Sequence, residues 1–232
     1  MAEGGRQLAL PFDPAPDGGR AHFIVSAANA DAVTLAGQWR AWPAGAALIL
    51  GPEGSGKSHL ARVWAAEAGA SRLVPAALVP ESVLALPTGA YVLDDADTVP
   101  DAQGAALYHL LNRCAAGQLA VLLTARRPSG DWNVTLPDAR TRVAALATAR
   151  LAQPDDAMLA GIVVKLFADR HILVREDVVE WLLKRIDRSV PAAQAAVDRI
   201  DEAALAAGAA VTVPFVARLF AGTEAGGDAP AA

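Results

Sequence analysis

Short apolar runs alternate with helical patterns through the first two thirds of the chain. The run 46–50 is uniformly apolar and ends at Gly51, which is typical of a buried strand. Strands are expected at 46–50, 71–74, 91–93, 119–123 and 149–151, and helices at 29–40, 59–68 and 102–116. Strands that alternate with helices build a parallel sheet covered on both faces. The sequence therefore predicts an α/β fold for this part.

After Pro154 the pattern is helical only. Helices are expected at 155–168, 176–188 and 191–208, and a last one from Thr212 through Phe220. Glu176 and Asp177 form a negative first turn, and Pro191 suits the start of a helix. The expected units are a flexible tail at 1–22, an α/β body at 23–152, an all-helical lid at 153–221 and a frayed end at 222–232.

Composition narrows the class of protein. The 232 residues carry a net charge of −5, and 53% are hydrophobic, which favours a packed core over disorder. No apolar run is long enough for a membrane span, and the first residues do not resemble a secretory signal. The single cysteine, Cys114, excludes an internal disulfide, so a reducing cytoplasm is expected. The acidic balance argues against a protein that coats DNA, although a local basic patch stays possible.

One motif strongly indicates phosphate binding. The segment Gly51-Pro52-Glu53-Gly54-Ser55-Gly56-Lys57-Ser58 fits the pattern G-x-x-x-x-G-K-S/T between an apolar strand and a helix. Its glycines let backbone amides surround a phosphate, and the helix N-terminus adds positive potential. Lys57 is expected to reach the β- and γ-phosphates, and Ser58 to ligate Mg²⁺. The expected cofactor is ADP or ATP with Mg²⁺.

Polar side chains follow two further apolar runs. Asp94 and Asp95 end the run 91–93, where Asp94 is expected to hold Mg²⁺ and Asp95 to polarise an attacking water. Thr124 ends the run 119–123, where its hydroxyl is expected to sense the γ-phosphate or orient water. Taken alone, Thr124 is better explained as a cap for the following turn.

Together these parts resemble an AAA+ nucleotide-binding module, and their details resemble the DnaA family of bacterial replication initiators. The resemblance lies in Gly56-Lys57-Ser58-His59-Leu60, in Leu93-Asp94-Asp95, and in Phe23-Ile24-Val25 followed by Asn29. It implies an AAA+ phosphate-loop body with a helical lid. It also implies that His59 belongs to the phosphate loop and that Phe23 and Val25 lie beside the adenine.

Two later segments are similar to the Hda family, the short DnaA homologues that inactivate the initiator. These are Leu182–Arg188 and Thr212–Val216. A DNA-binding helix-turn-helix domain is not expected, because the sequence stops after the lid. The first residues instead resemble a hexapeptide that binds the DNA polymerase sliding clamp, through Gln7, Leu8, Leu10, Pro11 and Phe12. Apolar side chains on a flexible segment suit a hydrophobic pocket, and Pro11 disfavours the alternative of an edge strand.

The resemblance implies a mechanism and partners. A clamp-bound protein contacts DnaA, and an arginine stabilises charge on the γ-phosphate of the initiator's ATP. Leu136-Pro137-Asp138 and Thr141-Arg142-Val143 resemble the arginine-finger region, so Arg142 is the expected finger and Arg140 the alternative. Contact with DNA is expected to be mainly indirect, through the clamp, and a homo-oligomer stays possible. No membrane contact is expected.

One position departs from the family pattern. The lid arginine that reads the γ-phosphate is replaced by Pro191, and Arg188 lies one turn earlier. This puts the chain's own ATP hydrolysis in doubt more than nucleotide binding. Three readings stay open: a regulatory adaptor that switches off DnaA, an autonomous ATPase of the helicase-loader type, and a binding module in which nucleotide is a structural staple.

Overall fold

The computed structural model describes residues 25, 26 and 28–224. The predicted tail, with Gln7, Leu8, Leu10, Pro11 and Phe12, lies outside the described residues, as do Phe23 and the last eight positions. The strands are β1 (Ala46–Leu50), β2 (Ser71–Leu73), β3 (Gly89–Leu93), β4 (Leu119–Ala125) and β5 (Ala147–Arg150). The helices are α1 (Ala30–Gly37), α2 (Lys57–Ala68), α3 (Pro80–Leu84), α4 (Gly104–Ala115), α5 (Pro137–Ala144), α6 (Asp156–Asp169), α7 (Glu176–Leu183), α8 (Val190–Ala207) and α9 (Val213–Glu224).

The five strands form one parallel sheet in the order β2-β3-β4-β1-β5. All five residues of β1 are buried, because helices cover both faces of this strand. The order places β1 next to β4 and β4 next to β3. Since the strands are parallel, the segments that follow β1, β3 and β4 all begin at the carboxyl end of the sheet. The phosphate loop and the two acids predicted from the sequence are therefore brought together.

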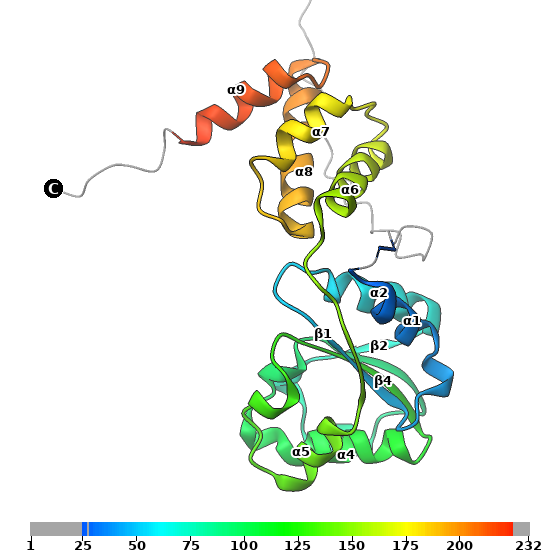
Figure 1. Cartoon of the computed structure of the whole chain (residues 1–232). Coiled ribbons are helices and arrows are strands. Elements are labelled where there is room, and N and C mark those ends of the chain that lie inside the picture. The colour runs from blue at the N-terminus through cyan, green and yellow to red at the C-terminus, as the bar shows by residue number, and fades with distance from the viewer. Residues whose placement is uncertain (1–24, 27, 225–232) are drawn as a thin grey trace, which may run out of the picture.

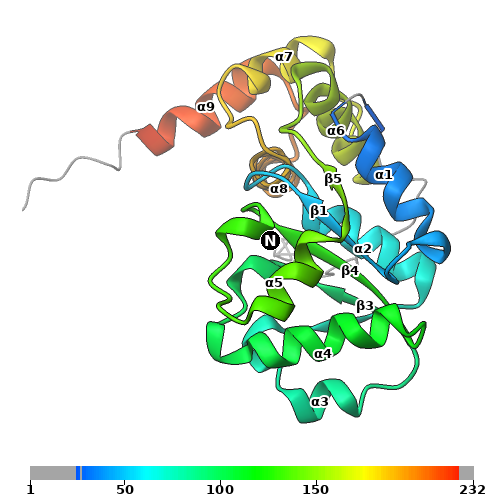
Figure 2. The same ribbon diagram turned by 60° about the horizontal axis from the view of Figure 1, so that its bottom comes forward.

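Helices cover both faces of the sheet (Figure 2), and a hydrophobic cluster fills the space on each face. On one face α4 packs through Leu107, Leu110, Leu111 and Cys114, which are all buried. On the other face α1 and α2 pack against the sheet, and Trp64 of α2 is stacked on Trp42 at 5.5 Å between ring centroids. The predicted α/β class and its parallel sheet are confirmed.

Helices α6 to α9 pack together around a separate hydrophobic cluster at one end of the molecule (Figure 1). Phe167, Val178 and Leu182 are among its fully buried side chains. Ser189 caps the N-terminus of α8, because its hydroxyl accepts a hydrogen bond from the amide of Ala192 at 3.2 Å.

In the part of the chain that the structure describes, no helix has the length and apolar character that a membrane crossing requires.

Several boundaries differ from those expected. The helix predicted at 176–188 ends at Leu183, because 184–189 turn back to let Ser189 cap α8. Pro191 is consequently the second residue of α8 and not the first. The helix predicted at 29–40 ends as an α-helix at Gly37, and a short 3-10 helix follows at Trp39–Ala41. Strand β4 runs one residue beyond Thr124, and α3 and α5 were not predicted.

Candidate nucleotide site

The phosphate loop runs from the end of β1 to the start of α2. Gly54 and Gly56 have φ angles of +75° and +95°, a left-handed conformation that glycine adopts without a steric penalty. Gly56 is the N-cap residue of α2, so the first amides of this helix face the loop. The side chain of Ser55 is buried, and its hydroxyl has no hydrogen-bond partner among the described residues. A buried polar atom of this kind marks a place where a ligand can bind.

Two distant segments cover the loop. A Cβ atom added to Gly51 would lie 2.3 Å from the carbonyl oxygen of Leu151, which follows β5. A Cβ atom added to Gly54 would lie 2.6 Å from the Cβ of Ser189, and the amide of Val190 donates to the Gly54 carbonyl at 3.3 Å. The start of α8 therefore rests directly on the phosphate loop.

Lys57 is buried at the start of α2. Its ammonium group donates a hydrogen bond to the carbonyl oxygen of Pro52 at 2.8 Å, so the side chain folds back over the loop. Burial lowers the pKa of Lys57, Asp95 opposes this effect, and Arg126 adds to it. A phosphate group placed in the loop would supply the anionic partner that favours the charged ammonium.

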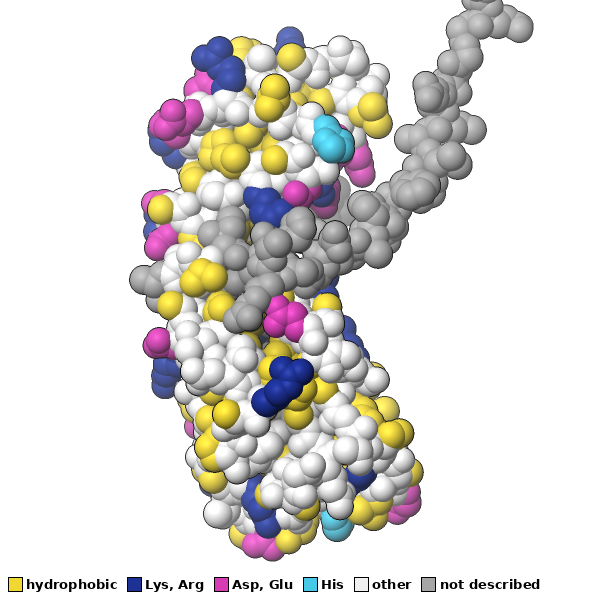
Figure 3. Space-filling view, turned by 90° about the vertical axis from the view of Figure 1, so that its right-hand side faces the viewer, with side chains coloured by type: hydrophobic (Ala, Val, Ile, Leu, Met, Phe, Trp, Pro, Cys, Tyr) yellow, Lys and Arg dark blue, Asp and Glu magenta, His cyan; other side chains and the backbone are white. Residues whose placement is uncertain are grey.

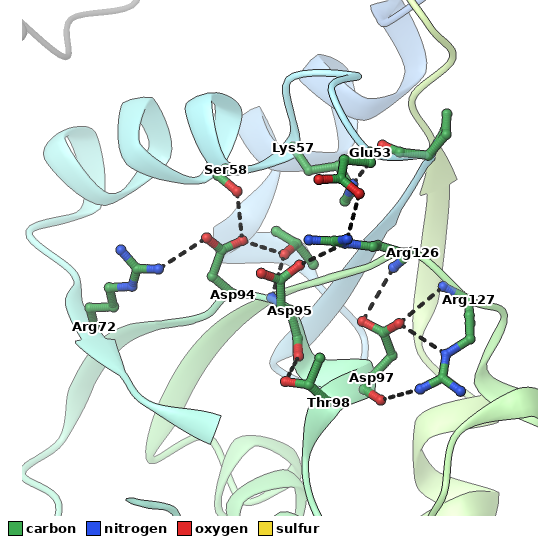
Figure 4. Close-up of polar contacts among 12 residues, drawn as sticks. Glu53, Lys57, Ser58, Arg72, Asp94, Asp95, Asp97, Thr98, Arg126 and Arg127 are labelled. Atoms are coloured by element: carbon green, nitrogen blue, oxygen red, sulfur yellow. Dashed lines mark hydrogen bonds and ion pairs between the residues drawn. The ribbon is translucent and has the colours of Figure 1, made fainter. Parts of the chain in front are cut away.

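Ser58, Asp94 and Thr124 are joined by hydrogen bonds, and Figure 4 shows Ser58 beside Asp94. The Ser58 hydroxyl donates to Oδ1 of Asp94 at 3.2 Å, and the Thr124 hydroxyl donates to the same oxygen. Thr124 is fully buried and also accepts a hydrogen bond from the amide of Asp95 at 2.9 Å. Its hydroxyl therefore holds the two acids in place, and its predicted contact with the γ-phosphate stays a prediction.

Two arginines that follow β4 contact acidic residues beside the phosphate loop. Arg126 follows β4 and pairs with Glu53 of the phosphate loop at 2.7 Å and with Asp95 at 3.6 Å. The backbone amides of Arg126 and Arg127 both donate to the buried carboxylate of Asp97 at 3.3 Å. In Figure 4, Arg126 lies between Glu53 and Asp95. The position of Arg126 directly after β4 was the signal that could have placed it here.

A third arginine comes from the edge of the sheet. Nη2 of Arg72, in β2, lies 3.2 Å from Oδ2 of Asp94. Sequence reasoning missed this contact, because β2 is short and its pairing partner could not be deduced from the pattern. One available signal was a charged residue directly before the apolar pair Leu73-Val74.

The two finger candidates lie on α5. Arg142 is partly buried, and its guanidinium carbon lies 5.3 Å from the ring centroid of Tyr108 on α4. Arg140 is exposed and lines an open cavity of about 420 Å³ with Pro137 and Thr141. No hydrogen bond or ion pair in the described part of the chain joins either side chain to the phosphate loop. In the described chain, neither arginine takes part in the polar contacts that join the phosphate loop to the acids of this site.

The residues expected beside adenine are only partly described. Val25 is exposed and lines a hydrophobic cavity of about 40 Å³ between α1 and α2. This volume is far below the ~300 Å³ of a typical ligand pocket, so the cavity itself does not hold a base. His59 is partly buried on α2 beside Ser58. Its role, and that of Phe23, stays a prediction.

The lid position that departs from the family pattern is also visible. Pro191 lies in the first turn of α8, next to the residues that touch Gly54. Arg188 pairs with Asp156 of α6 at 3.1 Å, and both side chains are exposed. The ion pair of Arg188 thus lies within the lid. Arg188 makes no hydrogen bond to the described phosphate loop.

Comparison with known proteins supports these observations. Residues 163–220 match the family model described as Hda, lid domain. This stretch contains α7 and α8 and most of α9. It includes both segments whose sequence resembles the Hda family.

Solved structures share the fold of nearly the whole chain. Domain III of the DnaA initiator of Thermotoga maritima has a TM-score of 0.73 at 17% identity, covering 89% of this chain and 97% of that one. A DnaA structure with AMPPCP and single-stranded DNA has a TM-score of 0.67 at 15% identity, covering 80% and 65%. The RuvB Holliday junction branch migration motor of Thermotoga maritima has a TM-score of 0.67 at 18% identity, covering 88% and 71%. The chain therefore carries a segment that matches the Hda lid model, and its fold is similar to those of DnaA domain III and RuvB.

Proposed function

We propose that the protein binds ADP or ATP at the phosphate loop. The observation that carries this is the combination of left-handed glycines, the unpartnered hydroxyl of Ser55 and the buried ammonium of Lys57 around one loop. The DnaA structure with AMPPCP supports the same ligand class. Lys57→Ala removes a charge-assisted contact worth about 1.5–3 kcal/mol, so ADP affinity is expected to fall about 10- to 150-fold.

The donor set beside the loop fits Mg²⁺. Ser58 and Asp94 offer a hydroxyl and a carboxylate, and Mg²⁺ takes such oxygens together with water and nucleotide phosphates. No group of three or more His, Cys, Asp or Glu within the described residues could hold a metal alone. This favours a metal that arrives with the nucleotide. Bound Mg²⁺ would neutralise charge on the phosphate oxygens.

The lid and the body together support a DnaA-related regulator. We infer that the protein acts on DnaA, stimulates hydrolysis of its ATP and leaves inactive ADP-DnaA. The hexapeptide 7–12 would dock on the DNA-loaded sliding clamp, and contact with DNA would be mainly indirect. On the face shown in Figure 3, Lys and Arg side chains are scattered and do not form one basic patch. The proposed location is the bacterial cytoplasm.

The finger would be supplied by α5. Arg142 is the residue predicted from the sequence, and it lies against the ring of Tyr108. Arg140 is already exposed beside the 420 Å³ cavity. In GTPases an arginine supplied by a partner raises the rate by roughly 10³–10⁵, which is an upper bound for this case.

The test is ATP hydrolysis by purified DnaA in the presence of clamp loaded on DNA. The wild-type protein, Arg142→Ala and Arg140→Ala are each added at equal concentration. Stimulation by wild type and Arg140→Ala but not by Arg142→Ala supports the regulator and its finger. The reverse pattern moves the finger to Arg140. Absence of stimulation by the wild-type protein rejects the regulator.

The geometry of the chain's own site supports a second candidate function. Lys57, Ser58, Asp94 and Asp95 surround one site, as an autonomous ATPase of the helicase-loader type requires. Basal ATP turnover without partners favours this alternative. Tight ADP binding without turnover favours the regulator or a structural role for nucleotide, and the two are then separated by the DnaA assay.

A further inference from the structure

Arg72 and Asp94 lie on the same face of the sheet. Arg72 is the middle residue of the edge strand β2, and its register partner in β3 is Val92, two positions before Asp94. Side chains alternate along a strand, and paired residues of neighbouring strands point to the same face. Arg72 therefore reaches Asp94 from β2, on the side away from Arg126, as Figure 4 shows.

Arg72 pairs with the carboxylate oxygen of Asp94 that accepts no hydrogen bond from Ser58 or Thr124. Oδ1 accepts from Ser58 and Thr124, and Oδ2 lies 3.2 Å from Arg72. The Asp94 side chain is only 8% exposed. A carboxylate buried to this extent is costly unless a cation compensates it. Arg72 is the cation that pairs with Asp94 among the described residues.

Arg72 is also easy to displace. Its side chain is 69% exposed and belongs to an edge strand, so water solvates the guanidinium once another cation takes its place at Asp94. A Mg²⁺ ion held near Ser58 and Asp94 would compensate the same carboxylate with two positive charges. Like charges repel, so the ion and the guanidinium cannot both stay close to Asp94 without a cost.

We propose that Arg72 is the counter-cation of Asp94 in the metal-free protein and gives way when Mg²⁺ binds with nucleotide. This inference rests on the proposed nucleotide-binding function. Because Arg72 then stabilises only the metal-free form, it weakens the apparent affinity for Mg²⁺. Arg72 is thus a residue that sets the magnesium requirement of the site and not a magnesium ligand.

The experiment measures binding of fluorescent ADP to the full chain while Mg²⁺ is titrated from zero in EDTA-treated buffer. Arg72→Ala is compared with wild type, and Arg72→Gln keeps side-chain length without the charge. Both variants are expected to need about two- to fivefold less Mg²⁺ for half-maximal binding, as expected for loss of an exposed ion pair. Arg72→Lys retains a cation and is expected to stay near wild type.

The matched control is Arg62→Ala. Arg62 is exposed on α2, one turn after Ser58, and makes no ion pair within the described residues. Its loss lowers the positive charge near the site without touching Asp94, so the Mg²⁺ requirement is expected not to fall. A melting curve of each variant without metal shows that it is folded.

The outcomes separate the two proposals. If ADP binds, but Arg72→Ala and Arg72→Gln need as much Mg²⁺ as wild type or more, the counter-cation role is overturned and nucleotide binding stands. An equal decrease for Arg62→Ala also overturns it, because a general charge effect then explains the result. If folded wild-type protein binds no ADP at any Mg²⁺ concentration, both proposals fail.

Discussion

The amide of Asp95 donates a hydrogen bond to the hydroxyl of Thr124 at 2.9 Å, and this bond ties the ends of two neighbouring strands together. The same hydroxyl donates to Asp94. Asp95 has a φ angle of +51°, which is uncommon for a residue other than glycine. Thr124 therefore stabilises the left-handed backbone of Asp95 and holds the carboxylate of Asp94 beside it.

Replacement of Thr124 by valine should destabilise this arrangement. Valine keeps the volume but leaves the amide of Asp95 and an oxygen of Asp94 without their partner. Each buried group left unpaired costs about 1–3 kcal/mol. The free energy of unfolding, measured by urea denaturation, is expected to fall by about 2–4 kcal/mol. Thr124→Ser keeps the hydroxyl and should lose less than about half of that amount; an equal loss would mean that packing dominates.

Gly54→Ala should move the lid off the phosphate loop. The new Cβ would meet Ser189 at 2.6 Å, and the φ angle of +75° adds backbone strain. Hydrogen exchange at the start of α8 is expected to become faster, because the bond from Val190 to Gly54 is lost. Unfolding free energy should also decrease by about 1–3 kcal/mol.

The control for that variant is Gly69→Ala. Gly69 has a φ angle of +63° but no atom within 4 Å of an added Cβ, so it measures backbone strain alone. It should leave exchange at α8 unchanged. Adding Ser189→Gly to Gly54→Ala removes the clashing Cβ and should restore part of the protection. Faster exchange in the Gly69 variant would show that the effect is not local.

Asp97 should be a major anchor of the segment that carries Arg126. Its carboxylate is 3% exposed and accepts bonds from the amides of Arg126 and Arg127 and from the Arg127 side chain. Asp97→Ala is expected to cost about 2–3 kcal/mol of unfolding free energy, because two amides lose their acceptor. Asp131→Ala removes an exposed acid in the same loop region and should change stability by less than about 0.5 kcal/mol.

Cys114 should be unreactive in the folded protein. Burial raises the pKa of its thiol to about 12, so the neutral form dominates at neutral pH. The raised pKa contributes stability that is present below pH 9, the ordinary value, and is lost as pH rises toward 12. Iodoacetamide at pH 8 is expected to label Cys114 only after urea unfolds the chain. Rapid labelling without urea would contradict the packing of α4.

Much of the fold was predictable because apolar periodicity records burial directly. The run 46–50 is buried at every position, as the prediction of a buried strand requires. In contrast, α5 carries few apolar residues, so periodicity did not reveal it, although Pro137 occupies a favourable first helical position. The end of α7 was overestimated for a related reason. The segment 184–189 contains helix-compatible residues, and the cap at Ser189 decides the boundary.

The candidate site was predictable where its residues lie within one short motif or directly after a predicted strand. Lys57 and Ser58 are placed by one motif, and Asp94 follows an unmistakable strand. Arg72 and Arg126 could not be placed in this way, because their partners lie on other strands and depend on the order of the sheet. The role of Arg142 depends on a second protein, so neither the pattern nor the fold of this chain determines it.

The contact of Gly54 with Ser189 links two positions that lie far apart in the chain. No side chain fits at the first position while the second keeps its Cβ. Among relatives that keep the lid closed in this way, the two positions cannot vary independently: a larger residue at 54 requires a smaller one at 189 or a displaced α8. The joint variation of these positions across a family would thus record, in sequence alone, which members hold the lid against the loop.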